Sequence, residues 1–201
     1  TQGGAQNCGT LFKMSPAGKV KTIHSVACAS EGSSVQSALT LGNDGLLYGA
    51  IQAGGANQYG SVFRATRKGV FQLLASFDGL NGRFPVAAPV AGPDGNYYGA
   101  ALDPWSGTTY RFAADGSLAA VARLDGLVTG RYPRGELLLA ADGYFYGTSS
   151  LDGEHAGGTV FRMDPVNESI QLVAPFDIHT TGSSPMAGLI EASDRYLYDT
   201  T

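Results

Sequence analysis

The sequence predicts an all-β fold, a β-propeller of four four-stranded antiparallel blades, each of about 50 residues. Three observations predict it. Short phrases return four times along the chain at nearly constant spacing, and Asp-Gly pairs separate the short apolar runs within the copies. The composition also fits, because 29 glycines, ten tyrosines and only 15% charged residues among 201 suit a β protein with many tight turns.

Two phrases carry the repeat. The first, "NDGLLYGA" at Asn43, returns as "PDGNYYGA" at Pro93, "ADGYFYGT" at Ala141 and "SDRYLYDT" at Ser193. The second, "GTLFKM" at Gly9, returns as "GSVFRA" at Gly60, "GTTYRF" at Gly107 and "GTVFRM" at Gly158. We expect their aromatic columns to form core between blades; the columns are Tyr48, Tyr98, Tyr146 and Tyr198, and Phe12, Phe63, Tyr110 and Phe161.

Each copy holds four short β-like runs. In the second copy these are residues 86–92, 96–102, 108–113 and 118–124, with Asp-Gly turns at Asp94 and Asp115. Asp-Gly between apolar runs is a strong hairpin signal, because the favoured two-residue turn needs φ > 0 at both central positions. In "YFYGT" both alternating faces are largely apolar, which indicates a sheet packed on both sides.

The two ends of the chain supply two halves of one blade. The C-terminal stretch carries the first two strands of a copy and the N-terminal stretch carries the last two, so we expect blades at 185–201 plus 1–27, 35–77, 84–124 and 133–176. Joining the halves removes two open strand edges. Closure within one chain gives a four-bladed ring, and closure between two chains gives a homodimer with eight blades. The sequence leaves both open.

Several partner classes are disfavoured by the bulk properties. The formal net charge of −4 and the pI near 5.2 leave no basic footprint for nucleic acid. No apolar run approaches the roughly 18 residues of a membrane-spanning helix, so we expect no membrane insertion. Two cysteines without a Cys-x-x-Cys pair do not make a zinc site, and we expect no cofactor.

The two cysteines are expected to form a disulfide. Cys8 and Cys28 flank a predicted strand pair and lie at nearly equal distances from its turn at 16–18. Cross-strand neighbours satisfy disulfide geometry, with Cα atoms roughly 4.4–6.8 Å apart. Such a bridge is typical of an oxidising compartment and therefore of an exported protein, extracellular, at the cell surface or in the periplasm.

The candidate site lies on the long loops. Turns within the first and last strand pairs are short and share one face of a propeller, whereas the remaining loops are long and share the other. Binding residues usually lie on such loops. Trp105 is the leading candidate, since an indole offers a sugar ring a flat apolar platform. The full candidate set is Arg83, Asp103, Trp105, Arg131, Glu154, His155 and His179.

Carboxylates and histidines suggest two alternatives. Asp78, Asp125 and Asp177 recur at one repeat position and, with Asp103 and Glu154, resemble the paired carboxylates of glycoside hydrolysis. A residue repeated in three blades is more typical of a turn that every blade needs. A metal site from Glu154, His155 and His179 is disfavoured, because they come from different loops without ligand spacing.

These phrases resemble the GloVer tandem-repeat family of bacterial secreted and surface-anchored proteins, over essentially the whole chain. The resemblance implies a propeller-like fold and export, but no established activity and no catalytic residues. Asp199 departs from the pattern, standing where the other copies have glycine. The matching residues are Gly158-Thr159-Val160-Phe161, Phe77-Asp78-Gly79, Pro185 with Gly188-Leu189, and Asp142-Gly143 with Tyr146-Gly147-Thr148.

We therefore expect one of two functions, and the preferred one is given first. The first is a non-catalytic extracellular module that binds glycan or protein, or serves surface assembly, through its loop-rich face. Four similar blades present similar loops, which favours repeated binding over one asymmetric catalytic centre. The alternative is a polysaccharide-active hydrolase or lyase that uses loop carboxylates.

Overall fold

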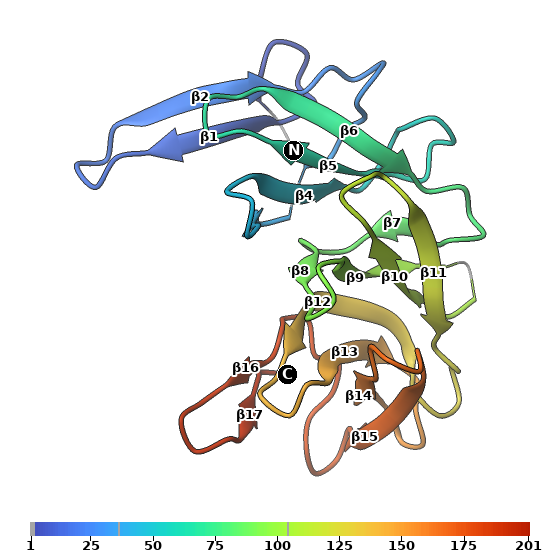
Figure 1. Cartoon of the computed structure of the whole chain (residues 1–201). Coiled ribbons are helices and arrows are strands. Elements are labelled where there is room, and N and C mark those ends of the chain that lie inside the picture. Colours follow the sequence, from blue (N-terminus) through green and yellow to red (C-terminus); the bar gives the residue numbers. More distant parts are fainter. Residues whose placement is uncertain (1–2, 36, 104) are drawn as a thin grey trace.

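The computed structural model describes residues 3–35, 37–103 and 105–201. In this part of the chain every regular element is a β-strand, and the strands form an arc of small sheets with the β1-β2 hairpin at one extremity and the β16-β17 hairpin at the other (Figure 1). An all-β, propeller-like fold is therefore confirmed. No helix long and apolar enough to cross a membrane occurs among the described residues.

The strands group by repeat. The N-terminal hairpin is β1 (Thr10–Met14) and β2 (Val20–Ser25). Blade I is β3 (Thr40–Leu41), β4 (Leu47–Ile51), β5 (Ser61–Ala65) and β6 (Phe71–Ser76). Blade II is β7 (Arg83–Pro85), β8 (Val90–Ala91), β9 (Tyr97–Leu102), β10 (Thr108–Phe112) and β11 (Leu118–Arg123). Blade III is β12 (Arg131–Leu139), β13 (Phe145–Leu151), β14 (Ala156–Met163) and β15 (Ile170–Asp177). The C-terminal hairpin is β16 (Ile190–Glu191) and β17 (Leu197–Tyr198).

The complete blades are antiparallel meanders, as the turn pattern predicts. Blade I has the order β3-β4-β5-β6 and blade III the order β12-β13-β14-β15. In blade II the first strand is split into β7 and β8, which both pair with β9. A register shift interrupts the pairing of the third and fourth strands just before the second aromatic column in each copy, at Leu11/Phe12, Val62/Phe63, Thr109/Tyr110 and Val160/Phe161.

One hydrogen-bonding unit recurs at the start of the second strand. The turn aspartate accepts the backbone N–H two residues later through Oδ1 and the tyrosine hydroxyl four residues later through Oδ2. The hydroxyl-to-carboxylate distances are 2.7–2.9 Å, and the pairs are Asp44–Tyr48, Asp94–Tyr98, Asp142–Tyr146 and Asp194–Tyr198. Burial and this bond raise the pKa of Tyr98. Burial acts to raise the pKa of Asp94, but its hydrogen bonds from Asn96 and Tyr98 outweigh burial and lower it.

The core lies between blades. Tyr48 of blade I stacks on Tyr97 of blade II with ring centroids 4.0 Å apart, and Tyr98 packs against Phe145 of blade III at 4.7 Å. The buried clusters join blade I to blade II, blade II to blade III, and each end hairpin to its neighbouring blade. The prediction that both faces of each sheet are packed is thus confirmed for the complete blades.

The end hairpins depart from the expected core. Phe12 is 59% exposed, whereas Phe63, Tyr110 and Phe161 of the same column are fully buried. Tyr198 is likewise 48% exposed. The physical reason is that the two hairpins form separate two-stranded sheets at opposite ends of the arc (Figure 1), so within the described single chain they do not pair into one blade. The blade boundaries and the ring closure therefore stay predictions.

The predicted disulfide is present. Cys8 and Cys28 are bonded across the N-terminal hairpin, with Cα atoms 5.4 Å apart. Cys8 is buried in the cluster that joins this hairpin to blade I, together with Leu11 and Val26. The bridge therefore holds the ends of the hairpin where it contacts the remainder of the fold.

Removing this bridge should be costly. We expect the Cys8→Ser/Cys28→Ser variant to lose about 3 kcal/mol of unfolding free energy, the value for a closed loop of roughly 20 residues. Urea unfolding of the variant and of the oxidised protein measures the loss. An unchanged unfolding midpoint would contradict it.

The tyrosine–aspartate bond should show in the pH dependence of stability. Tyr98→Phe removes the donor and keeps the ring, so we expect a loss of about 1 kcal/mol between about pH 5 and 9. The pKa of Asp94 is lowered, so the stability that its ionised carboxylate contributes is lost as pH falls through that pKa. The pKa of Tyr98 is raised, so the stability that its protonated hydroxyl contributes is lost as pH rises through that pKa.

Urea unfolding at stepped pH measures both edges of this window. Tyr196→Phe is the matched control, since Tyr196 is 70% exposed beside the equivalent turn. A loss for Tyr98→Phe that is the same at every pH would show that the hydroxyl acts by packing alone.

Candidate functional site

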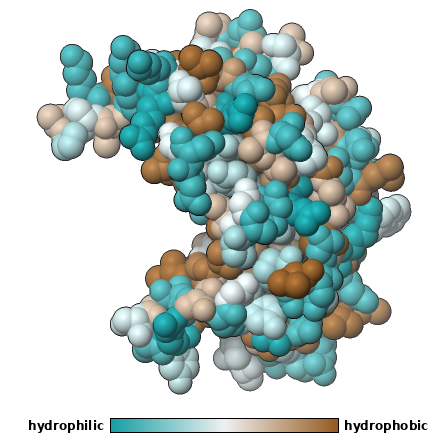
Figure 2. All heavy atoms as spheres, in the orientation of Figure 1, coloured by the Kyte–Doolittle hydropathy of each residue, from teal (hydrophilic) through white to brown (hydrophobic). Residues whose placement is uncertain are grey.

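The inner side of the arc carries a hollow of about 550 Å³. Figure 2 shows the molecule indented on this side, between the two end hairpins. Its walls are the innermost segments of three blades and the C-terminal hairpin, where a propeller has its central channel. The lining residues are Ser37, Ala38, Val86, Ala87, Val90, Gly135, Glu136, Leu137, Leu138, Leu139, Gly188, Leu189 and Ile190.

Glu136 is the one ionisable side chain among these lining residues. It lies on β12, and the repeat register aligns it with Ala38, Ala88 and Gly188, which are all small. Its side chain is exposed at the hollow, and partial desolvation there raises the pKa of its carboxyl, with no charge or hydrogen bond among the described residues opposing that effect. A carboxyl with a raised pKa in a largely apolar hollow is suited to general acid–base chemistry.

A second hollow, of about 390 Å³, lies where blade III meets the C-terminal hairpin. Its polar groups already have partners. Asp142 accepts the Tyr146 hydroxyl, and Glu191 accepts both the N–H of Ala141 at 2.8 Å and the Arg195 guanidinium at 3.3 Å. This hollow is therefore better explained as a seam between two sheets.

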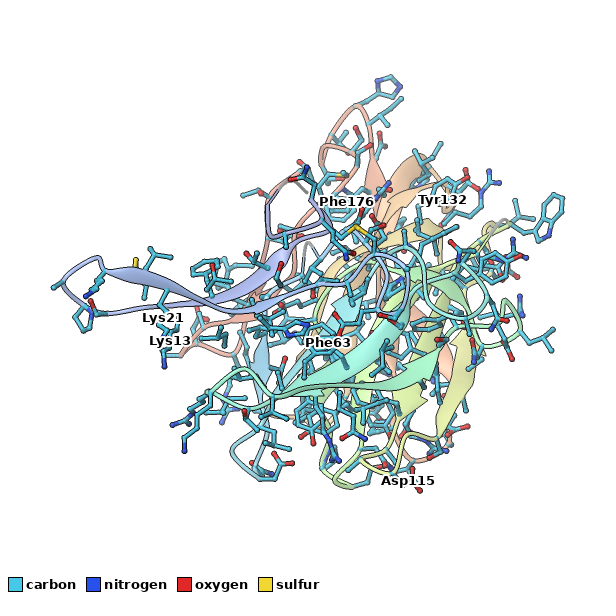
Figure 3. All side chains as sticks on the ribbon, turned by 90° about the horizontal axis from the view of Figure 1, so that it is seen from above. Lys13, Lys21, Phe63, Asp115, Tyr132 and Phe176 are labelled. Atoms are coloured by element: carbon cyan, nitrogen blue, oxygen red, sulfur yellow. A yellow bond between two sulfur atoms is a disulfide. The ribbon has the colours of Figure 1, made fainter. Side chains whose placement is uncertain are left out.

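The loop-rich rim of the inner side is fixed by residues in a left-handed conformation. Phe84 and Tyr132 have φ of 50° and 56°, which is rare for bulky residues. The backbone N–H of Phe84 donates to Tyr59 O and that of Tyr132 to Ser106 O, each at 2.7 Å and each in the preceding blade. The strain is thus offset by a bond between blades. Figure 3 shows Tyr132 and the short-turn residue Asp115 at opposite faces.

Among the predicted site residues, Asp103 and Trp105 are close neighbours in one loop. Asp103 is only 5% exposed, and its Oδ2 lies 2.5 Å from Nη1 of Arg123. Its Oδ1 accepts the N–H of Trp105 at 3.0 Å. Trp105 itself is 80% exposed. The carboxylate therefore holds the loop in shape, and the indole is presented to solvent.

The two predicted arginines each have a partner in a different segment of the chain. The guanidinium of Arg131 is hydrogen-bonded to Asp152. Arg83 lies over the ring of Tyr59, with 4.6 Å from Cζ to the centroid. Both arginines brace loops, and neither extends to the Asp103 carboxylate in the described contacts.

Glu154, His155 and His179 are exposed on two loops of blade III. Within residues 3–35, 37–103 and 105–201, no three His, Cys, Asp or Glu side chains gather as metal ligands. The recurring aspartates are turn residues, as their repetition predicts. Oδ1 of Asp78, Asp125 and Asp177 accepts the N–H two residues later, at 2.7–2.9 Å.

Sequence reasoning missed Glu136, Tyr132 and Phe84 as residues of the inner face and its rim. The signal for Glu136 was present, because a charged residue interrupts a column of small ones in the repeat alignment. Nothing in the sequence marks Tyr132 or Phe84, since the left-handed conformation appears only in the folded chain.

A family model described as the Gloeobacter/Verrucomicrobia repeat matches residues 1–201, which confirms the resemblance drawn from the repeated phrases. No curated protein matches the chain. Solved structures do match, at low identity.

A protein from Bacteroides uniformis assigned as a 6-phosphogluconolactonase matches at 19% identity and TM-score 0.60, over 94% of this chain and 56% of its own. The gluconolactonase XC5397 from Xanthomonas campestris matches at 17% and 0.53, over 92% and 59%. TolB from Acinetobacter baumannii matches at 13% and 0.53, over 83% and 38%. The chain thus spans less than two thirds of each of these structures.

These comparisons correct the first expectation, that of a non-catalytic module. Two of these three structures are described as gluconolactonases or 6-phosphogluconolactonases, and they favour the hydrolase alternative. At these identities the likeness itself shows the fold alone. The expected use of loop carboxylates also needs correction for Asp103, because that carboxylate is already engaged by Arg123.

The bracing role of Asp103 is testable. We expect Asp103→Ala to lower the unfolding free energy by about 2 kcal/mol, because it removes hydrogen bonds to a buried charged group. Glu154→Ala, an exposed loop carboxylate, is the matched control and should change it by less than about 0.5 kcal/mol. Thermal or urea unfolding measures both, and equal effects would show that Asp103 braces nothing.

Proposed function

We propose that the chain, which belongs to the Gloeobacter/Verrucomicrobia repeat family, forms blades of an exported propeller hydrolase that opens sugar-derived cyclic esters on its inner face, with Glu136 as the acid–base group. The observation that carries the proposal is a single carboxyl of raised pKa in the hollow at the propeller axis. The matched gluconolactonase structures support the substrate class.

The number of carboxylates favours an ester over a glycosidic bond. Glycoside hydrolysis needs two carboxyl groups about 5–10 Å apart, one on each side of the scissile bond. The inner hollow offers one among its lining residues. Opening a lactone needs one base, since the carbonyl carbon is already electrophilic and the ring oxygen remains attached to the product.

The proposed step balances with that one group. The Glu136 carboxylate takes a proton from water while the water oxygen bonds to the lactone carbonyl carbon. The bond between that carbon and the ring oxygen then breaks, and the proton passes from Glu136 to the ring oxygen. Because the pKa of the carboxyl is raised, its carboxylate is a stronger base toward the attacking water than that of an ordinary glutamate.

Other features of the chain fit this role. The exposed Trp105 and the rim aromatics Phe84 and Tyr132 are proposed to contact the sugar-derived ring, with the remaining predicted loop residues around them. The Cys8–Cys28 disulfide supports export to an oxidising compartment. The same proposal includes four blades of about 50 residues in this chain, one of them built from both chain ends.

The direct test is hydrolysis of D-glucono-1,5-lactone, followed by acid release and corrected for the spontaneous reaction. We expect Glu136→Gln to lower kcat/KM by about 10²-fold or more, the usual contribution of a general acid–base group. Asp115→Asn, an exposed carboxylate on a short turn of the opposite face, is the matched control and should leave the rate unchanged. The wild-type rate should rise with pH through the raised pKa of Glu136.

Equal rates for wild type and Glu136→Gln would remove this residue from the mechanism. A wild type that leaves the lactone untouched but cleaves polysaccharide would instead favour the paired-carboxylate chemistry.

A further inference from the structure

Positive charge is concentrated in one part of the molecule. The chain has a formal net charge of −4, yet all of its lysines lie before residue 70, together with Arg64 and Arg67. The carboxylates in that part of the sequence are Glu31 and Asp44, and both are already hydrogen-bonded. Segregated charge of this kind indicates a surface for a partner of opposite sign.

The cations come from the N-terminal hairpin and from the turn between β5 and β6 of blade I. Gly69 of this turn lies so close to β2 that a Cβ on it would collide with the carbonyl oxygen of Ile23. Nζ of Lys13 lies 3.5 Å from the carbonyl oxygen of Arg67. The two segments therefore form one surface, which we call the basic corner. Its cations, all of them exposed, are Lys13, Lys19, Lys21, Arg67 and Lys68.

The hairpin departs from the complete blades at the residue opposite its third-strand cation. In blade I that residue is Gln72, which accepts a hydrogen bond from Nε of Arg64 at 3.0 Å, and blade III repeats the arrangement. In the hairpin Lys21 is paired in register with Lys13, and Figure 3 shows the two on the projecting hairpin. Like charges directly opposite each other destabilise a strand pair. The hairpin thus has a second cation where blades I and III have an acceptor.

The contact between the hairpin and blade I also differs from the contact between blades II and III. There the turn of blade III carries Glu168, whose carboxylate lies 3.0 Å from the guanidinium of Arg111 in blade II. The corresponding turn of blade I carries Arg67 and Lys68 beside Lys13. None of these three cations forms an ion pair with a carboxylate of the described residues. An ion pair at one contact is replaced by cations alone at the other.

The basic corner is exposed whatever adjoins the hairpin. Blade I has a neighbour on each side, and its residues that align with Lys19 and Lys21 are Val70 and Gln72. Val70 is 69% exposed, and Gln72 is exposed as well. A neighbouring blade therefore does not cover these positions, and the other cations on the turn belong to blade I itself.

A hollow beside the turn indicates which anionic partner fits. It has a volume of about 510 Å³ and is lined by the apolar side chains of Leu46 and Val70 and by the cations Arg67 and Lys68. An apolar surface suits the C–H face of a sugar ring, and adjacent cations suit its acidic groups. The lining residues include no aromatic ring on which a nucleic-acid base could stack. A bilayer is bound by projecting apolar side chains, not by a hollow.

We propose that the basic corner binds an acidic polysaccharide, whose carboxylate or sulfate groups contact the cations of the hairpin and of the blade I turn while one sugar ring lies in the hollow. The proposal does not depend on the hydrolase function, because the residues that line the inner hollow include none of the basic corner.

Titration with polygalacturonate and with dextran sulfate tests the proposal, and neutral dextran is the control. We expect at least one acidic polymer to bind and its affinity to fall as NaCl is raised, because salt screens exposed charges. The polymer that binds more tightly identifies the acidic group. Failure of both to bind would overturn the proposal. Tighter binding of single-stranded DNA, or of vesicles that contain phosphatidylglycerol, would overturn it in favour of that partner.

Two substitutions give the basic corner the residues that complete blades carry. Lys21→Gln introduces the amide of blades I and III, and Lys68→Glu introduces a carboxylate like that on the turn of blade III. We expect the dissociation constant to rise about threefold for Lys21→Gln and about tenfold for Lys68→Glu. Arg195→Gln removes an exposed cation from the C-terminal hairpin, so it is the matched control for Lys21→Gln and should have no effect.

Unfolding in urea distinguishes recognition from a structural role. Because Lys21→Gln removes a pair of like charges, its unfolding midpoint should stay the same or rise while binding weakens. A lower midpoint would show that Lys21 stabilises the hairpin, and an equal loss of affinity for Arg195→Gln would show that only net charge matters. Either result would overturn the proposal.

Discussion

The hydrogen bond from a tyrosine hydroxyl to the aspartate four residues before it is the contact on which each blade depends. One carboxylate closes the turn through one oxygen and holds the tyrosine through the other. The ring is thereby fixed at the blade surface, where Tyr48 meets Tyr97 and Tyr98 meets Phe145 of the following blade. A local turn thus determines a long-range contact. This explains why the aspartate and the tyrosine persist together even in "SDRYLYDT", where both glycines of the phrase are lost.

Most of the fold could be predicted because the repeat expresses it four times. Turn chemistry located the hairpins, and the aromatic columns located the interblade core. The Cys8–Cys28 pair followed from its symmetry about a turn. The prediction failed for Phe12 and Tyr198, whose repeat positions match buried residues although their own neighbours are missing. An aromatic column of the repeat predicts which side chains face a neighbouring strand or blade, but a side chain is buried only where that neighbour is present.

The candidate site was harder to predict, for a physical reason. Loop residues such as Asp103 attract attention because they are charged and unique, yet charged loop residues are also the ones that brace loops, and Arg123 had no mark in the sequence as its partner. Glu136 lies in an apolar strand, where a repeat-based interpretation expects only packing. Its place on the inner wall follows from how the blades are arranged around the arc, which the sequence of one blade does not contain.

At the left-handed residues of the rim, the main chain joins the blades while the side chains are free to differ. The blades are fastened there by the main chain, through the N–H groups of Phe84, Tyr132 and Ser184. Ser184 has φ of 58° and donates to Gly157 O at 2.8 Å, so the bond does not depend on which side chain the residue carries. The three copies already differ, with a phenyl, a phenol and a hydroxymethyl group at one geometric position. A lineage of such proteins can therefore diversify the chemistry of its rim by point substitution while the joint between blades stays the same.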